Sequence, residues 1–151
     1  MNRIIKILIA SVLICLAASC DKAPETDVAI VAEWHLIEMT GVDAVSLPQV
    51  YIDFKADKTF EMYQKVGEGR FRKYDGTYLV TESLVTGEYS DGEAWGSGYT
   101  VSFEGDDDIL VLTADNGSGE VCRYEKASLD QSEKDNADVV TKAALYEERF
   151  L

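Results

Sequence analysis

The chain has 151 residues, enough for one domain, and hydrophobic residues make up 46% of it, enough to form a packed core. It carries 28 Asp and Glu residues against 14 Lys and Arg, so its formal net charge is -14. A charge of this sign and size repels phosphate backbones and excludes nucleic acid as a partner. Eight Tyr, five Phe and two Trp beside only two Pro favour strands over helices.

The N-terminal segment has the layout of a secretory signal. Two basic residues precede an almost wholly apolar run at 7–18, which is shorter than the roughly 20 residues that a membrane-spanning helix needs. Small residues then lead into Cys20, and the sequence Leu16-Ala17-Ala18-Ser19-Cys20 resembles the lipobox of bacterial lipoproteins. The resemblance implies that residues 1–19 are removed and that Cys20 carries a diacylglycerol and an amide-linked acyl chain such as palmitate. An ordinary signal cleaved near Ala18, with Cys20 a free thiol, is the alternative.

Lipidation at Cys20 places the protein in the cell envelope. We expect it on the outer membrane, at the periplasmic face or the cell surface, with the polar residues 20–29 as a tether. Cys122 then has no intramolecular partner and is expected to be buried as a small hydrophobic residue. Without lipidation, a Cys20–Cys122 disulfide is the alternative.

From Glu33 onward, apolar and polar residues alternate with the period of two that is typical of half-buried strands. Turn residues such as Gly, Asn and Asp separate eight runs of this kind. The predicted strands lie at 33–39, 49–55, 58–66, 69–80, 83–90, 95–104, 108–114 and 119–127. Consecutive hairpins favour an antiparallel meander, and eight strands can close into an up-and-down barrel without exposed edges. A two-sheet sandwich is the alternative.

The region 30–128 resembles the lipocalin-like lipoproteins of the Bacteroidetes type. The resemblance is carried by Ala32-Glu33-Trp34-His35-Leu36 in the first strand, by residues 87–99 in the middle, and by Cys122-Arg123-Tyr124-Glu125-Lys126 in the last strand. It implies an all-β, eight-stranded lipocalin-like barrel whose closed end is plugged by Trp34. It also implies that a late arginine stacks across this tryptophan, and Arg123 is the candidate. Otherwise Arg123 is an outward-facing strand residue.

The remaining residues, 129–151, begin as a charged segment without a clear pattern. Apolar residues then recur with helical spacing at Val139, Ala143, Tyr146 and Phe150, and Asn136 is placed to cap such a helix. The resemblance to lipocalins implies one helix packed outside the barrel after the eighth strand. We therefore expect a polar linker and a short C-terminal helix, with a frayed tail as the alternative.

No motif in the chain points to catalysis. There is no Gly-x-Ser-x-Gly, phosphate loop or dinucleotide fingerprint. His35, the single histidine, falls on the strand face opposite Trp34 and is expected to be outward-facing and inert. The acidic run at 106–108 fits a hairpin turn better than a calcium loop. The sequence therefore predicts a non-enzymatic protein without a metal or a cofactor.

Aromatic residues gather in the middle strands and their loops, where they suit the mouth of a ligand pocket. In an up-and-down barrel, the loop at 55–58 lies at the end that Trp34 closes, and the loops after odd-numbered strands lie at the other end. Met39, Tyr89 and Trp95 are then the candidates for contacting a small, partly apolar ligand in the barrel. The alternative is a filled barrel that acts as a structural or protein-interaction module.

Overall fold

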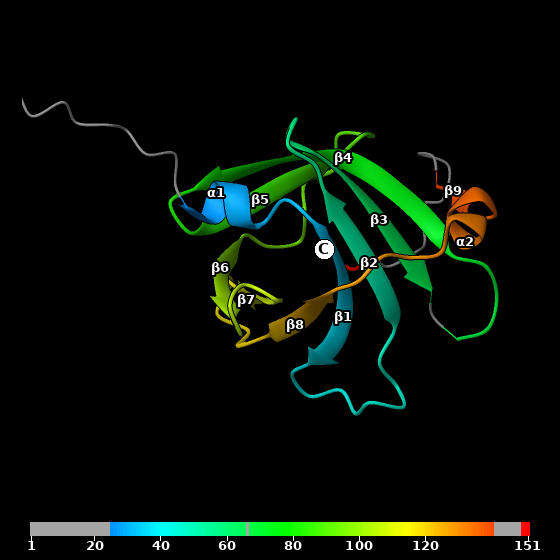
Figure 1. Ribbon diagram of the computed structural model, residues 1–151, viewed down its shortest axis with the longest axis horizontal. Coiled ribbons are helices and arrows are strands. Elements are labelled where there is room, and N and C mark those ends of the chain that lie inside the picture. The colour runs from blue at the N-terminus through cyan, green and yellow to red at the C-terminus, as the bar shows by residue number, and fades with distance from the viewer. Residues whose placement is uncertain (1–24, 66, 141–148) are drawn as a thin grey trace, which may run out of the picture.

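Eight antiparallel strands form a closed barrel in the computed structural model, which describes residues 25–65, 67–140 and 149–151 (Figure 1). The strands are β1 (Glu33–Met39), β2 (Gln49–Phe54), β3 (Thr59–Lys65), β4 (Arg72–Thr81), β5 (Leu84–Tyr89), β6 (Tyr99–Glu104), β7 (Ile109–Ala114) and β8 (Val121–Lys126). Each strand pairs with the next, and β1 also pairs with β8, which closes the barrel. The expected up-and-down barrel is confirmed, and a two-sheet sandwich is not formed.

The sixth strand begins later than predicted, at Tyr99 rather than at residue 95. The preceding loop folds back along β5: Glu88 forms an isolated bridge with Ala94, and the Trp95 amide donates to the carbonyl of Gly87. The direct pairing of β5 with β6 is consequently short, with only Leu84 and Val85 in register with β6. The backbone hydrogen bonds of residues 94 and 95 are satisfied by β5, so they do not extend β6.

The interior of the barrel is packed with apolar side chains from alternating positions of all eight strands. The largest side chains with almost no exposed surface are Trp34, Tyr124, Phe54, Phe60, Ile30, Leu36, Ile52 and Met62. Gly76 on β4 is required by the close approach of the neighbouring strand, because a Cβ atom there would lie 2.1 Å from the carbonyl oxygen of Glu88. Burial of this cluster is the main favourable contribution to folding.

A short helix, α1 (Glu25–Ala29), covers one end of the barrel (Figure 1). Asp27 on this helix forms an ion pair with Lys58 in the turn between β2 and β3. Ile30, which follows the helix, has no exposed surface. Residues 25–29 thus form part of the folded domain, which corrects the expectation that all of 20–29 is a polar tether; residues 20–24 lie outside the described residues.

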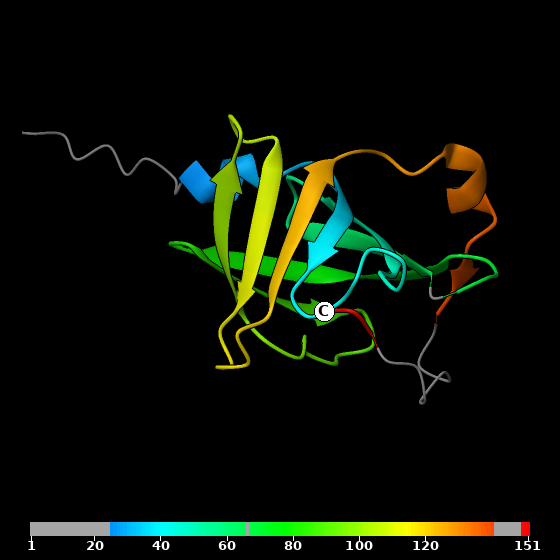
Figure 2. The same cartoon turned by 90° about the horizontal axis from the view of Figure 1, so that it is seen from below.

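The segment after β8 runs along the outside of the barrel and contains helix α2 (Gln131–Asp135) and strand β9 (Asp138–Val139), which pairs in parallel with β4 (Figure 2). The short helix is confirmed, but it lies earlier than the predicted apolar stripe. Asn136 follows the helix at its C-terminal end instead of capping its start, and Val139 lies in β9. Ala143 and Tyr146 of the predicted stripe lie outside the described residues.

A second, smaller apolar cluster holds this segment against the barrel. Leu129 and Ala137 pack with Tyr63, Phe71 and Tyr51 on the outer side of the sheet. The described residues contain no helix with the length and apolar character needed to cross a membrane.

Candidate functional site: the mouth of the barrel

The strand directions define two different ends of the barrel. The end where β1 begins is covered by α1 and holds Trp34. At the opposite end, which we call the mouth, β1, β3, β5 and β7 finish and β4 starts. The segments expected to lie opposite Trp34, around 39–48, 66–69, 90–95 and 115–119, follow strands that finish at the mouth. The assignment of loops to the two ends is therefore confirmed.

Residues 149–151 lie at the mouth of the barrel (Figures 1 and 2). Only 5% of the surface of Leu151 is exposed, and this side chain is part of the barrel core. The hydroxyl of Tyr89 donates a hydrogen bond of 2.8 Å to the backbone carbonyl of Leu151. The amide of Phe150 donates to Oε1 of Gln64, a mostly buried polar residue, over 3.0 Å. The mouth thus buries an apolar side chain and also hydrogen-bonds the backbone that carries it.

Arg149 lies between carboxylates and aromatic rings at the edge of the mouth. Its guanidinium forms hydrogen bonds with both carboxylate oxygens of Asp91 and lies 3.3 Å from Glu93. Its central carbon is 4.4 Å from the ring centre of Tyr89 and 5.9 Å from that of Tyr74. Hydrogen bonds from Arg149 and from the Glu93 amide lower the pKa of Asp91 to about 2. The carboxylate is therefore fully charged at neutral pH, as the ion pair requires.

Little space remains beside Arg149. The residual cavity, lined by residues that include Tyr74, Tyr89, Asp91 and Val140, has a volume of about 10 Å³. That is at the lower limit for one water molecule. Burial raises the pKa of Tyr89, so its hydroxyl stays protonated and able to donate at physiological pH. Among the residues that the structure describes, segment 149–151 occupies the mouth.

Trp95 lies inside the barrel with 6% of its surface exposed. Its indole packs over Gly87, where a Cβ atom would lie 2.2 Å from the ring, and contacts Phe54, Phe60 and Tyr99 edge to face. Its Nε1 is buried and has no hydrogen-bond partner among the described residues. The sequence predicts this aromatic residue beside a turn at the barrel entrance. In the structure, the loop before β6 directs its side chain into the barrel interior.

Met39 and Cys122 face each other in the pairing of β1 with β8 near the mouth. Met39 is half-buried and packs against the core, whereas Cys122 is fully buried. Burial, together with the nearby carboxylate of Glu120, raises the pKa of the Cys122 thiol to about 12. Tyr124 lies on the same face of β8 and is fully buried, and its hydroxyl interacts with the Cys122 side chain.

Trp34 is fully buried at the covered end, and its Nε1 donates a 2.8 Å hydrogen bond to the carbonyl of Ile30. The cation over its ring is Lys126, with Nζ 5.5 Å from the ring centre. The expectation that Arg123 fills this role is wrong. Arg123 lies on the outer face of β8, where it pairs with Glu104 at 3.1 Å and Glu38 at 3.6 Å. Residues 123 and 126 point to opposite faces because strand side chains alternate.

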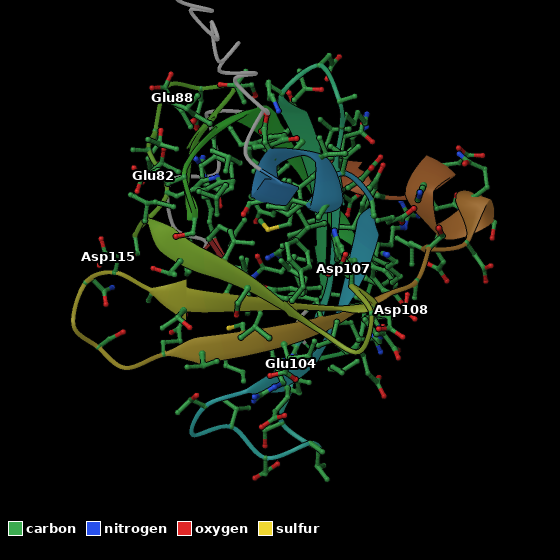
Figure 3. The ribbon with its side chains drawn as sticks, turned by 60° about the vertical axis from the view of Figure 1, so that its left-hand side comes forward. Glu82, Glu88, Glu104, Asp107, Asp108 and Asp115 are labelled. Carbon is green, nitrogen blue, oxygen red and sulfur yellow. The ribbon has the colours of Figure 1, made fainter. Side chains whose placement is uncertain are left out.

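The outer surface is strongly acidic. Figure 3 labels exposed carboxylates in the turn before β5, on β5, at the end of β6, in the turn between β6 and β7, and after β7. They are Glu82, Glu88, Glu104, Asp107, Asp108 and Asp115. The predicted turn at 105–107 is confirmed by three consecutive positive φ angles and by a hydrogen bond from the amide of Asp108 to Gly105. Within the described ranges, no group of three His, Cys, Asp or Glu side chains is arranged to hold a metal ion.

His35 lies on the outer face of β1, as its position in the strand predicts. Its ring stacks on Tyr51 with 4.4 Å between the ring centres, and Nδ1 lies 3.3 Å from Oε1 of Glu125. The described contacts pair His35 with structural neighbours on the sheet and do not include a nucleophile.

A closed eight-stranded antiparallel barrel with one covered end defines the class of up-and-down β-barrels. The family described as "Lipocalin-like domain" matches residues 30–112, more than half of the chain, and the chain therefore belongs to this family. Lipocalin-like domains are generally non-enzymatic binding proteins. No curated protein matches the chain. Segment 149–151 lies beyond the matched residues.

Sequence reasoning did not find Gln64, Arg149 or Leu151 as residues of the mouth. Their role depends on contacts of residues 149–151 with β3 and β5, which lie far away in the sequence.

Proposed function

We propose that this chain is a non-enzymatic binding protein that holds a small, partly apolar ligand in the mouth of its barrel. One observation carries the proposal. The mouth takes up the apolar side chain of Leu151 and supplies the hydroxyl of Tyr89 to the attached carbonyl. An apolar cavity with a few well-placed polar groups is the usual design of a small-molecule site. We infer that Leu151 occupies the position that such a ligand would take.

The three residues proposed from sequence have different parts in this site. Tyr89 supplies the hydrogen-bond donor. Trp95 forms an inner apolar wall, because its ring packs against Phe54 and Phe60 behind the mouth. Met39 lies at the finishing end of β1, where its flexible side chain can adapt to a ligand.

We also propose that the protein is lipid-anchored through Cys20 to the outer membrane. Support comes from the basic and apolar leader and the small residues before Cys20. The described chain begins with α1 at the covered end. An anchor at Cys20 would then hold the covered end toward the membrane and leave the mouth facing away from it. Replacing Cys20 by Ser should abolish membrane fractionation, and persistent membrane association of that variant would contradict the anchor.

Intrinsic fluorescence tests the ligand proposal. Fatty acids, sterols and bile-acid-like compounds are titrated into the chain from residue 20 onward with Cys20→Ser, which keeps every described residue. We expect a saturable change for at least one class, and loss of most of that change in Trp95→Phe, since Trp34 is at the far end of the barrel. Absence of a saturable change for every one of these classes, and also for a cationic amphiphile such as octylguanidine, would contradict the proposal.

The second candidate function is a structural or protein-interaction module with a filled barrel. Its support is the dense aromatic interior and the occupied mouth. Native mass spectrometry of the protein purified from its natural host separates the two functions. A retained small molecule favours the binding protein. A bare chain that also fails the titration favours the interaction module.

A further inference from the structure

The mouth surrounds a cation as well as an apolar group. The guanidinium of Arg149 is enclosed by two carboxylates, Asp91 and Glu93, and by the faces of two aromatic rings, Tyr74 and Tyr89. Carboxylates and aromatic faces both attract positive charge, and they do so more strongly where water is excluded. Only 15% of the Arg149 side chain is exposed. These four side chains together bind a positive charge, and they lie next to the position of the buried Leu151 side chain.

We propose that the mouth recognises a cationic, partly apolar ligand, and that segment 149–151 is a built-in occupant that must leave before this ligand binds. This inference rests on the proposed function, and it adds the charge of the ligand and the means by which access is controlled. The ligand carries a guanidinium or ammonium group, which replaces Arg149 between Asp91 and the ring of Tyr89. Its apolar part replaces Leu151.

The charge of the whole chain supports a cationic ligand. Acidic residues outnumber basic ones two to one, and exposed carboxylates such as Glu88 and Asp115 lie beside the loops of the mouth. The resulting negative potential raises the local concentration of cations and repels anions such as fatty-acid carboxylates. In the absence of a ligand, Arg149 provides the positive charge that balances the carboxylates of the mouth.

The contacts of the segment are few enough for it to be displaced. Among the described residues, they are burial of Leu151, packing of Phe150 on the core, hydrogen bonds at Phe150 and Leu151, and the ion pairs and ring contacts of Arg149. One of these ion pairs involves Glu93, which is 70% exposed and therefore contributes little to stability. A site that is open for a fraction of the time binds ligand with an affinity reduced by that fraction. Weakening the segment should therefore strengthen binding of an external ligand.

Calorimetric titration of the Cys20→Ser chain from residue 20 tests the inference with defined probes. Acetyl-Arg-Phe-Leu-amide and octylguanidine represent a peptide source and a small-amine source of the same chemistry. Acetyl-Glu-Phe-Leu-amide and octanoate are their anionic controls. Arg149→Glu is the opened variant, since a carboxylate there is repelled by Asp91, and Arg149→Lys is the matched control that keeps the charge. A thermal melt of each variant verifies folding, and a deletion of residues 149–151 serves as a second opened variant.

We expect at least one cationic probe to bind the opened variant about tenfold or more tighter than the wild-type chain, as removal of a competing internal occupant predicts. Adding Asp91→Asn and Glu93→Gln to the opened variant should weaken this binding about tenfold or more, and the anionic probes should bind weakly throughout. Equal binding of cationic and anionic probes, or equal affinity in the wild-type and opened chains, would overturn the inference and leave the proposed function standing. Failure of every probe, together with failure of the fatty acids and sterols, would overturn the proposed function as well.

Discussion

Tyr89 on β5 and Leu151 at the end of the described chain are joined by a hydrogen bond of 2.8 Å between the tyrosine hydroxyl and the leucine carbonyl. They are 62 positions apart in sequence. Because the Tyr89 side chain is almost fully buried, loss of either partner would leave a buried polar group unsatisfied. The bond therefore fixes where segment 149–151 lies and keeps the mouth occupied.

Tyr89→Phe should remove this bond while keeping the ring that faces Arg149. We expect the free energy of unfolding to fall by about 1–2 kcal/mol, because the carbonyl of Leu151 loses its buried donor. Chemical denaturation measures the change. Tyr78→Phe is a matched control, since the Tyr78 hydroxyl donates 2.8 Å to the carbonyl of Lys55 at the covered end. The control should lose stability without increasing hydrogen exchange at Phe150, and equal exchange in both variants would contradict the assignment.

Trp34→Ala should be among the most damaging single changes in the barrel. The side chain is fully buried, and truncating a large aromatic core residue costs roughly 3–5 kcal/mol. That is much of the stability of a small domain, which is about 5–15 kcal/mol. A variant that melts within a degree or two of the wild-type chain would show that Trp34 does not close the barrel end.

Gly87→Ala tests whether the Trp95 ring packs directly against Gly87 of β5. The added methyl group would lie 2.2 Å from the indole, so the ring must move or β5 must distort, at an expected cost of roughly 1–3 kcal/mol. Gly96→Ala is the control, because a Cβ atom there meets nothing within 4 Å. Thermal melting and Trp95 fluorescence report the two effects. Equal stability of the two variants would place Trp95 elsewhere.

The Cys122 thiol should be unreactive in the folded protein. Its pKa of about 12 and its burial leave almost no accessible thiolate at pH 8. In the Cys20→Ser chain from residue 20, a thiol-specific disulfide reagent should react only after unfolding in guanidinium. Rapid reaction of the native protein at pH 8 would contradict the buried position.

Glu61 predicts a pH dependence of stability. Burial raises its pKa, but hydrogen bonds from Lys73 and Lys55 outweigh this effect and lower it to about 2. Because the folded value lies below the ordinary value of 4.5, the stabilisation is complete above about pH 4.5 and is lost as the pH falls toward 2.

Glu61→Gln should therefore lose about 1 kcal/mol at pH 7, a value reduced for solvent screening, and the difference from wild type should shrink below pH 4.5. Urea denaturation at several pH values measures it. The exposed Glu88→Gln is the control. A difference that stays constant from pH 7 to pH 2.5 would show that the ion pairs of Glu61 are not its cause.

The barrel was predictable because each strand alternates with period two and each hairpin carries its own turn residues. The burial of Trp34 follows from the same local pattern. The partner of Trp34 was not predictable, since choosing Arg123 or Lys126 requires the side-chain facing near the end of β8, which depends on pairing across the sheet. Local spacing also favoured a helix for Val139, but pairing with β4 satisfies its backbone instead. Residues 149–151 contact β3 and β5, which are far away in the sequence. Such contacts produce no periodic pattern, so they could not be predicted from the sequence.

Hydrogen exchange at the Phe150 amide, followed by NMR, tests the central claim that segment 149–151 occupies a binding site in the mouth. This amide donates to Gln64 in the structure. We predict that it is protected from exchange in the free chain and that it loses protection when a bound ligand reaches saturation. Exchange at the rate of an unprotected amide in the free chain, or protection that is unchanged by a saturating ligand, would contradict the account.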